Sequence, residues 1–209
     1  MYLILDLVCL GEKDPALVAS ESIAGGATCI QLRAKDVPDI TLLKTGQTIR
    51  RITLKHNVPL IVNDRLDMAL ALDADGVHLG QDDIPVQIAR RILGRDKVIG
   101  ATVETPEEAK TAEREGASYL GTGPVFVTTT KPDAGDAYGP SLIRKIKAAT
   151  LLPVVAVGGI SAQNARLLRR AAADGIAVAS AVLGRDDTRQ ATREIKNAFL
   201  GVRDQGECK

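Results

Sequence analysis

The chain alternates short apolar runs with longer amphipathic stretches. The apolar runs are rich in β-branched residues and predict eight strands, at residues 2–8, 28–33, 59–63, 76–80, 97–102, 118–122, 153–158 and 176–181. The stretches between them have a helical period and predict helices that include residues 39–56, 85–93, 105–115, 140–149, 161–173 and 187–200. We expect Thr105, Ser161 and Asp187 to cap helices, because each stands at the start of such a stretch and offers a side-chain oxygen.

Eight strand–helix units in 209 residues predict a closed, single-domain (β/α)8 barrel, the TIM barrel. The strands read as continuous apolar runs, as parallel strands that are buried on both faces do. A doubly wound open sheet is the alternative, but it normally carries a glycine-rich phosphate loop after its first strand. The first strand here ends in Asp6-Leu7-Val8 and has no such loop. We therefore expect one α/β barrel domain over residues 1–200 and a polar tail over residues 201–209.

Composition narrows the function classes. Lys and Arg number 27 against 26 Asp and Glu, so the net charge of +1 provides no basic field for nucleic acid. Three tyrosines, two phenylalanines and no tryptophan are too few for a base-stacking surface. Three cysteines without CxxC spacing argue against a disulfide framework or a zinc ribbon, and favour a reducing compartment. The apolar N-terminus is short and lacks a basic leader, and no apolar run approaches the length of a membrane span. These features predict a soluble cytoplasmic protein without nucleic-acid or membrane partners, and leave homo-oligomerisation open.

Polar residues follow several predicted strands at the end where a barrel of this kind carries its reacting groups. In the segment QLRAK, strand alternation places Gln31, Arg33 and Lys35 on one face. Two cations and an amide at a buried strand end are costly to desolvate unless an anion pairs with them. These residues therefore predict an anion site, and a solvated strand exit is the alternative.

Two aspartates follow the third and fourth predicted strands, in Asn63-Asp64-Arg65 and in the segment GQDD that ends at Asp83. Neighbouring strands lie roughly 5 Å apart, so the two carboxylates would repel one another unless a cation lies between them. Mg²⁺ bound together with substrate phosphates resolves that conflict. The alternative is that each aspartate caps the helix that follows it.

A second anion site is predicted on the same rim. After the sixth strand, GPVFVTTTK places threonine hydroxyls and backbone N–H groups beside Lys131, and the small residues of the 132–139 loop suit a mobile lid. A plain threonine-rich loop is the alternative. Gly158-Gly159 after the seventh strand and Ala179-Ser180 after the eighth offer backbone N–H groups to a phosphate. A reaction that joins a diphosphate to a monophosphate would use this layout.

We assign no chemistry to the histidines or to Cys29. We expect His78 to be a hydrogen-bonded interior residue, His56 to lie on the surface and Cys29 to lie in the core.

The motifs QLRAK, NDR, GQDD, GPVFVTTTK and VGGI, in this order, resemble the thiamine-phosphate synthases over nearly the whole chain. The resemblance implies a (β/α)8 barrel transferase that joins 4-amino-2-methyl-5-pyrimidinylmethyl diphosphate to a thiazole monophosphate, with or without a carboxylate on the thiazole. It releases diphosphate and forms thiamine phosphate. The resemblance implies that Gln31 and Thr102 contact the aminopyrimidine, that Arg33, Lys35, Asn63 and Lys131 contact the diphosphate, that Asp64 and Asp83 hold magnesium (Mg²⁺), and that Thr128, Thr130, Gly159, Ala179 and Ser180 receive the thiazole phosphate.

The chain departs from the family pattern after the fifth strand. A family motif of the form G-x-S-x-H-T reads here from Gly100 to Thr105 with Thr102 at the serine position and Glu104 at the histidine position. Threonine keeps the hydroxyl and adds a methyl group. Ala179 stands where the family usually has isoleucine, and its contribution is expected through the backbone N–H.

The reaction implied by the resemblance is dissociative and needs no general base. Arg33, Lys35 and Lys131 would neutralise charge on the departing diphosphate together with Mg²⁺, and the thiazole nitrogen would attack the pyrimidine cation. Three alternatives differ in what they require. A related thiazole tautomerase would lack the metal pair and the diphosphate residues, which are present. A phosphosugar isomerase or epimerase would need an acid–base pair, for which only Asp6 and His78 are candidates. A non-catalytic thiamine-pathway binding protein has no need for cations at a leaving group.

Overall fold

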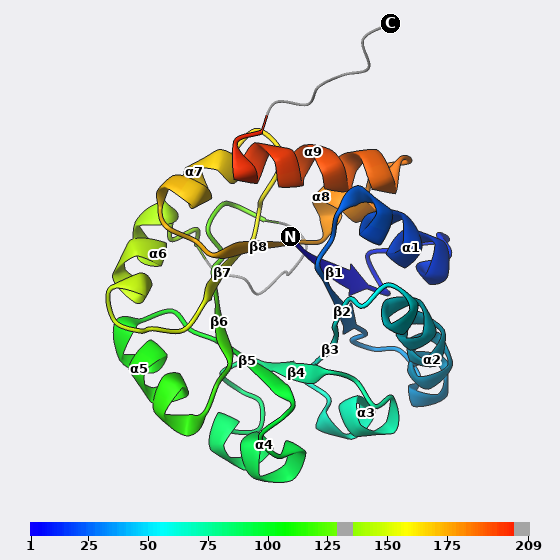
Figure 1. Cartoon of the computed structure of the whole chain (residues 1–209), viewed down its shortest axis with the longest axis horizontal. Helices are drawn as coiled ribbons and strands as arrows, with labels where there is room; N and C mark the ends of the chain where they lie inside the picture. The colour runs from blue at the N-terminus through cyan, green and yellow to red at the C-terminus, as the bar shows by residue number, and fades with distance from the viewer. Residues whose placement is uncertain (129–135, 203–209) are drawn as a thin grey trace, which may run out of the picture.

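The computed structural model describes residues 1–128 and 136–202. Its eight strands are β1 (Tyr2–Asp6), β2 (Cys29–Arg33), β3 (Leu60–Asn63), β4 (Gly76–Leu79), β5 (Val98–Thr102), β6 (Tyr119–Thr122), β7 (Val154–Val157) and β8 (Gly175–Val178). They pair in parallel in chain order, and β8 pairs with β1 to close the barrel. The helices surround this ring of strands (Figure 1). The predicted (β/α)8 barrel is confirmed.

The helices are α1 (Pro15–Gly25), α2 (Asp39–Lys55), α3 (Leu66–Ala71), α4 (Val86–Leu93), α5 (Pro106–Glu115), α6 (Pro140–Lys147), α7 (Ala165–Arg170), α8 (Ser180–Leu183) and α9 (Thr188–Leu200). Thr105 and Asp187 cap α5 and α9 as predicted. The predicted cap at Ser161 is wrong, because α7 begins four residues later and the Ser161 N–H instead donates to the side chain of Asn164. No helix in the described part of the chain has the length and apolar character needed to cross a bilayer.

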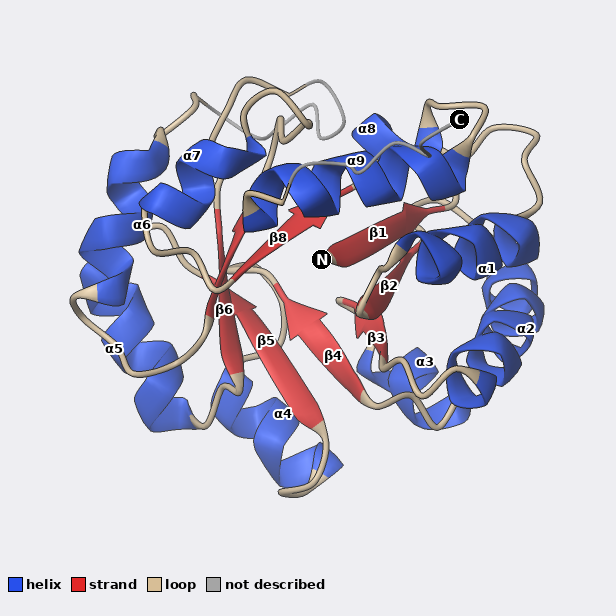
Figure 2. Cartoon of the chain, turned by 45° about the horizontal axis from the view of Figure 1, so that its top comes forward, coloured by secondary structure: helices blue, strands red, loops and turns tan. Residues whose placement is uncertain are grey.

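Two strands are shorter than their apolar runs suggest. β1 ends at Asp6, whose carboxylate accepts the N–H groups of Val8 and Cys9 and so turns the chain out of the strand. β8 ends at Val178, and the backbone leaves the extended conformation at Ala179, before α8. Ser180 therefore stands at the start of a short helix and not on a strand. Figure 2 shows α8 lying beside α9.

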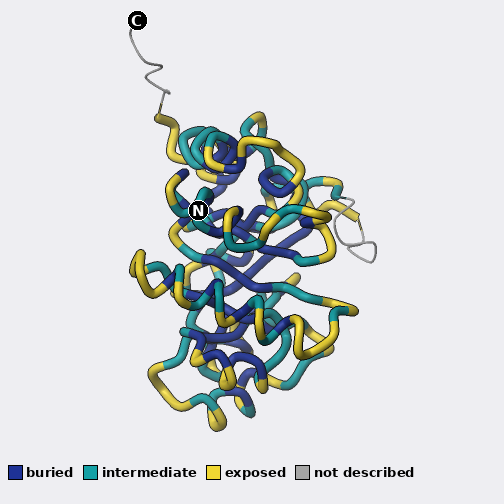
Figure 3. Tube along the Cα trace, turned by 90° about the vertical axis from the view of Figure 1, so that its right-hand side faces the viewer, coloured by how far each residue is buried: buried dark blue, intermediate teal, exposed yellow. Residues whose placement is uncertain are grey.

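The core lies mainly between the strands and the helices. Outward-facing strand residues such as Leu3, Leu32 and Leu120 pack there against the apolar faces of the helices. A smaller cluster fills the inside of the barrel, built from Tyr2, Ile61, Tyr119 and Ala177. Figure 3 shows the buried backbone running through the middle of the molecule, with exposed turns at its edges.

The N-terminal ends of the strands are fastened by a repeated contact. The side chain of the residue before each even-numbered strand accepts a hydrogen bond from a backbone nitrogen at or next to the start of the preceding odd-numbered strand. The acceptors are Thr28, Asp75, Ser118 and Asp174, and the donors are Met1, Leu60, Ile99 and Val154. Cations from the helices reach three of the acceptors: Arg50 reaches Asp75, Arg90 reaches Ser118, and Lys147 reaches Asp174. This end of a barrel serves stability, so the other end remains for chemistry.

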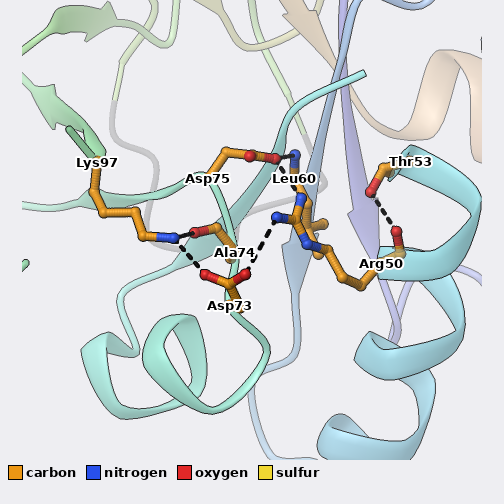
Figure 4. Close-up of polar contacts among 7 residues, drawn as sticks. All are labelled: Arg50, Thr53, Leu60, Asp73, Ala74, Asp75 and Lys97. Atoms are coloured by element: carbon orange, nitrogen blue, oxygen red, sulfur yellow. Dashed lines mark hydrogen bonds and ion pairs between the residues drawn. The ribbon is translucent and has the colours of Figure 1, made fainter. Parts of the chain in front are cut away.

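Figure 4 shows the most extensive of these contacts. The Asp75 carboxylate lies 2.7 Å from the Leu60 nitrogen and 2.6 Å from Nη1 of Arg50. Asp73 lies beside it and accepts from Lys97 at 2.6 Å. Arg50 is largely buried, and the carboxylates of Asp73 and Asp75 before β4 balance its charge.

Candidate active site

The inner face of the barrel is polar towards the C-terminal ends of its strands. Asp6 and Arg33 are the last residues of β1 and β2 and are directly paired in register. Asn63 and Thr102 end β3 and β5, and both are half-buried. Strand alternation puts these side chains on the same inner face as Tyr2 and Gln31. Gln31 and Arg33 of the first predicted anion site therefore face the same barrel mouth as Asn63 and Thr102, which the resemblance assigns to substrate binding.

Asp64 and Asp83 lie together just beyond β3 and β4. Burial and the neighbouring Asp83 carboxyl group raise the pKa of Asp64 from 3.8 to about 6, although Lys35 and Arg33 act in the opposite direction. A shared carboxylate site of this kind attracts a cation. The expectation that the two aspartates share one place on the rim agrees with this geometry, whereas Asp82 is exposed to solvent.

Neither aspartate caps a helix. Both α3 and α4 begin without a side-chain hydrogen bond at the cap position, so the capping alternative is wrong for this pair. Asp83 instead accepts the Gly80 N–H at 2.6 Å. Asp64 has a left-handed backbone with φ +61°, a conformation that costs energy in a residue with a side chain. Its own N–H donates to the carbonyl of His78 at 2.8 Å, which ties the turn to β4.

Two cations flank the acidic pair. The Lys35 Nζ atom lies 3.9 Å from Asp64 Oδ2, and half of the Lys35 side chain is exposed. The Arg33 guanidinium forms an ion pair with Asp6 and is mostly buried. Anionic groups of a ligand can thus meet positive charge from two side chains of the segment QLRAK.

The donor set fits magnesium. Mg²⁺ is usually bound through one or two carboxylates plus phosphate oxygens and water. Asp64 and Asp83 supply two carboxylates, and the described residues contain no group of three or more His, Cys, Asp and Glu side chains that could enclose a metal alone. A phosphate-bearing ligand would complete such a coordination shell.

A hydrogen-bonded chain of side chains runs across the barrel interior below the mouth. Gln31 donates to the Tyr2 hydroxyl at 2.8 Å, and that hydroxyl lies 2.9 Å from the hydroxyl of Tyr119. Tyr119 in turn lies 2.9 Å from Nδ1 of His78, whose Nε2 is 3.0 Å from Thr102 Oγ1. Burial lowers the pKa of His78 to about 4, so its imidazole is neutral at pH 7.

This chain of contacts confirms His78 as a hydrogen-bonded interior residue. His56 is exposed, also as predicted, and Cys29 is half-buried against the interior cluster. Asp6 is engaged by Arg33, so neither Asp6 nor His78 is free to serve as the acid–base pair of an isomerase. Sequence reasoning did not identify Tyr2 and Tyr119, although both stand on inward-facing positions of predicted strands.

The turn after β7 presents unengaged backbone N–H groups. Gly158 and Gly159 both have left-handed backbones, with φ +96° and +62°. The N–H groups of Gly158, Gly159 and Ile160 donate no hydrogen bond to any residue that the structure describes. Asn164 closes the turn, because its amide donates to the Gly159 carbonyl at 2.9 Å and accepts from Ser161 at 2.8 Å. Successive N–H groups in such a turn form a concavity suited to an anion.

Gly159 is required for packing as well. A Cβ atom there would lie 2.4 Å from the carbonyl oxygen of Val127. The turn after β7 therefore packs directly against the chain that leaves β6. Phe126 donates to the carbonyl of Gly158 at 3.1 Å, which joins the two segments further.

The segment after β6 is described only in part. Thr128 is half-buried, whereas Thr130, Lys131 and the first half of the predicted lid at 132–139 lie outside the described residues. Where the chain is described again, Tyr138 donates its hydroxyl to Glu104 at 2.8 Å. Glu104, which departs from the family motif, is thus hydrogen-bonded to the segment that leads into α6.

The residues after β8 form the start of α8. Ala179 is half-buried at the cap position, and Ser180 is the first helical residue. Lys13 fixes the other end of this helix by donating to the carbonyls of Leu183 and Arg185, each at 2.7 Å. α8 is therefore held in place from the loop that follows β1.

Comparison with known proteins gives one consistent result. A family model described as thiamine monophosphate synthase matches residues 1–182. A thiamine-phosphate synthase of Desulfitobacterium hafniense is 45% identical over 187 residues, which is 90% of each chain. One from Roseiflexus castenholzii is 46% identical and covers 93% of this chain and 86% of its own. The solved thiamine phosphate pyrophosphorylase from Pyrococcus furiosus is 42% identical with a TM-score of 0.86, and the match covers 96% of this chain and 95% of that one.

Proposed function

The chain belongs to the thiamine monophosphate synthase family and is a transferase of thiamine biosynthesis, and on this basis we propose a Mg²⁺-dependent, dissociative reaction at the barrel mouth. The enzyme joins 4-amino-2-methyl-5-pyrimidinylmethyl diphosphate to a thiazole monophosphate. The products are thiamine phosphate and diphosphate. A thiazole that carries a carboxylate would in addition release carbon dioxide.

The observation that carries this proposal is the position of the paired carboxylates beside two cations. Asp64 and Asp83 share one site. Lys35 and Arg33 lie close enough to Asp64 to oppose part of the rise in its pKa. A diphosphate bound here would meet side-chain cations directly and would share a metal ion with the carboxylates. A binding site for an uncharged or monoanionic ligand would not need this density of charge.

In this proposal Asp64 and Asp83 hold Mg²⁺, and Arg33, Lys35 and Asn63 hold the diphosphate with Lys131. Mg²⁺ held by these carboxylates would supply positive charge against the negative charge that develops on the departing diphosphate. Arg33 and Lys35 stabilise that charge most strongly in the transition state, because it grows there as the C–O bond breaks. The aminopyrimidine rests between Gln31 and Thr102, whose side chains are held by the interior hydrogen bonds.

The second half of the reaction requires the thiazole to be correctly positioned and involves no proton transfer. The C–O bond breaks with its electron pair passing to diphosphate, and the thiazole nitrogen lone pair then forms the new C–N bond. No proton leaves during this step, so no general base is required. The thiazole phosphate binds at the N–H groups of Gly159 and its neighbours, with Thr128, Thr130, Ala179 and Ser180 around it.

The test is incubation of the purified protein with both phosphorylated substrates, in Mg²⁺ and in EDTA, with chromatographic detection of products. The thiazole is supplied with and without its carboxylate. We expect equal amounts of thiamine phosphate and diphosphate with Mg²⁺ and a loss of at least a hundredfold in rate in EDTA, roughly the effect of removing a main electrostatic contributor. Product formation that is unchanged in EDTA would rule out the metal role.

A further inference from the structure

Among the described residues, the carboxylate of Asp6 is the most deeply buried charged group at the barrel mouth. Only 1% of its side chain is exposed. Its Oδ1 atom accepts the N–H groups of Val8 at 3.0 Å and Cys9 at 3.2 Å, and its Oδ2 atom pairs with Arg33. The backbone thus fixes one oxygen of Asp6, while the other oxygen faces a cation on the neighbouring strand.

Arg33 has no other partner among the residues that the structure describes. One of its nitrogens, Nη1, meets Asp6, and a guanidinium carries five N–H donors in a rigid plane. Holding one nitrogen restricts where the guanidinium can lie and leaves the remaining donors for an anion. A long side chain that is oriented in advance loses less entropy when it binds its ligand.

The burial of Asp6 limits how Arg33 can move. If Arg33 left Asp6 entirely for a bound diphosphate, a buried carboxylate would remain without its cation, which is strongly unfavourable. The guanidinium must therefore keep Asp6 while it contacts the diphosphate. Asp6 and the ligand would share one cation from two sides.

We propose that Asp6 is a positioning residue for the reaction, and that it acts through Arg33 by holding the guanidinium at the leaving group. This inference rests on the proposed function. The structural feature is a buried carboxylate at the end of β1 that is anchored by two backbone N–H groups and paired in register with Arg33 on β2.

The experiment is a double-mutant cycle with the variants Asp6→Asn and Arg33→Ala, alone and combined. Asparagine keeps the shape of the side chain and an oxygen for the two N–H groups, but it removes the charge. We expect Asp6→Asn to lower kcat about tenfold to a hundredfold, as loss of an orienting partner typically does, with less than a twofold change in the KM for the thiazole phosphate. In the Arg33→Ala background the same change should alter kcat less than twofold. A second readout is titration of inorganic diphosphate with Mg²⁺, in which Asp6→Asn should weaken binding only while Arg33 is present.

The matched control is Asp14→Asn. Asp14 lies in the same β1–α1 loop and also accepts a backbone N–H, from Ala16, but it is exposed and pairs with no arginine in the described part of the chain. Its replacement should leave kcat unchanged within twofold. Should Asp6→Asn fail to fold, Asp6→Ser takes its place in the cycle, since a serine hydroxyl accepts nearby N–H groups but is too short to reach Arg33.

The outcomes are distinct. Multiplicative losses of kcat in the double variant would show that Asp6 and Arg33 act independently and would overturn the proposal, as would full kcat in Asp6→Asn. A parent protein that forms no thiamine phosphate would instead refute the proposed function, while the diphosphate titrations would still test whether Asp6 orients Arg33.

Discussion

Replacing Asp64 with asparagine should stabilise the metal-free protein at pH 7. The change removes one charge of the acidic pair and keeps the size of the side chain. Asparagine also tolerates the left-handed backbone at this position, where φ is +61°. The attractions lost among the described residues are a contact with Lys35 at 3.9 Å and a weaker pull from Arg33. Lys35 is half exposed and Arg33 is already paired with Asp6, so the loss is small.

The magnitude follows from the pKa of Asp64, which rises from 3.8 to about 6 through burial and the Asp83 carboxyl group. One pKa unit corresponds to about 1.4 kcal/mol, so the charged form costs the fold at most about 3 kcal/mol at pH 7. The two carboxylates share this cost, so we expect Asp64→Asn to recover about 1–3 kcal/mol. For a chain of this length, that corresponds to a rise in Tm of roughly 2–12 °C.

The pH dependence has a definite sign. The folded-state pKa of Asp64 lies above its unfolded value, so its favourable contribution is present below about pH 4 and is lost as the pH rises towards 6. The stability advantage of Asp64→Asn should therefore be largest at pH 7 and should vanish near pH 4. Thermal unfolding in EDTA at several pH values, followed by circular dichroism, measures this directly.

Mg²⁺ with inorganic diphosphate should reverse the order of stability. A ligand at 1,000 times its Kd stabilises the folded state by about 4.1 kcal/mol, which exceeds the advantage of Asp64→Asn, and only the parent retains both carboxylates. Asp82→Asn, an exposed change on the β4–α4 loop, should behave as the parent does throughout. A fall in the Tm of Asp64→Asn in EDTA at pH 7 would refute the reasoning, because it would mean that the charge of Asp64 stabilises the fold.

Three further changes test other parts of the account. Lys35→Met should lower kcat about tenfold to a hundredfold in steady-state assays, because one charge-assisted hydrogen bond is lost, while the KM for the thiazole phosphate stays within twofold. A changed KM for the thiazole phosphate with an unchanged kcat would contradict this. Gly159→Ala should cost about 1–2 kcal/mol of stability and raise the KM for the thiazole phosphate, because a Cβ atom at this left-handed residue would lie 2.4 Å from the Val127 oxygen. Calorimetric binding of the thiazole phosphate as tight as in the parent would count against the second anion site. Asp75→Asn should lower the free energy of unfolding by about 1–3 kcal/mol with kcat unchanged, because its contacts with Leu60 and Arg50 lie at the opposite end of the barrel; an equal loss of kcat would show that the two ends are coupled.

The fold was predictable because its main determinant is local. Each strand is a short apolar run, each helix follows in order, and eight such units close a barrel. The end of β8 was not predictable in the same way. Residues 176–183 form one apolar run of small and β-branched residues, which is compatible with a strand or a helix, and packing decides that the strand ends at Val178.

The site could be predicted where it depends only on which residues follow the strands, and not where it depends on how the strands pair or where the helices begin. Asp64 and Asp83 each follow a strand, so their proximity could be inferred from the order of the elements. Whether they cap helices could not, since the answer depends on where α3 and α4 begin. The role of Asp6 was missed for a similar reason, because its partner Arg33 lies 27 residues away and becomes a neighbour only through the register of β1 with β2.

The most direct test of the central claim is the initial rate of thiamine phosphate formation as Mg²⁺ is titrated at fixed, saturating substrates. It should be measured for the parent, Asp64→Asn and Asp82→Asn. The account predicts rates that rise and saturate with Mg²⁺ for the parent and Asp82→Asn, and a rate at least a hundredfold lower for Asp64→Asn at every Mg²⁺ concentration. An Asp64→Asn protein that reaches the parent rate with the same dependence on Mg²⁺ would contradict it.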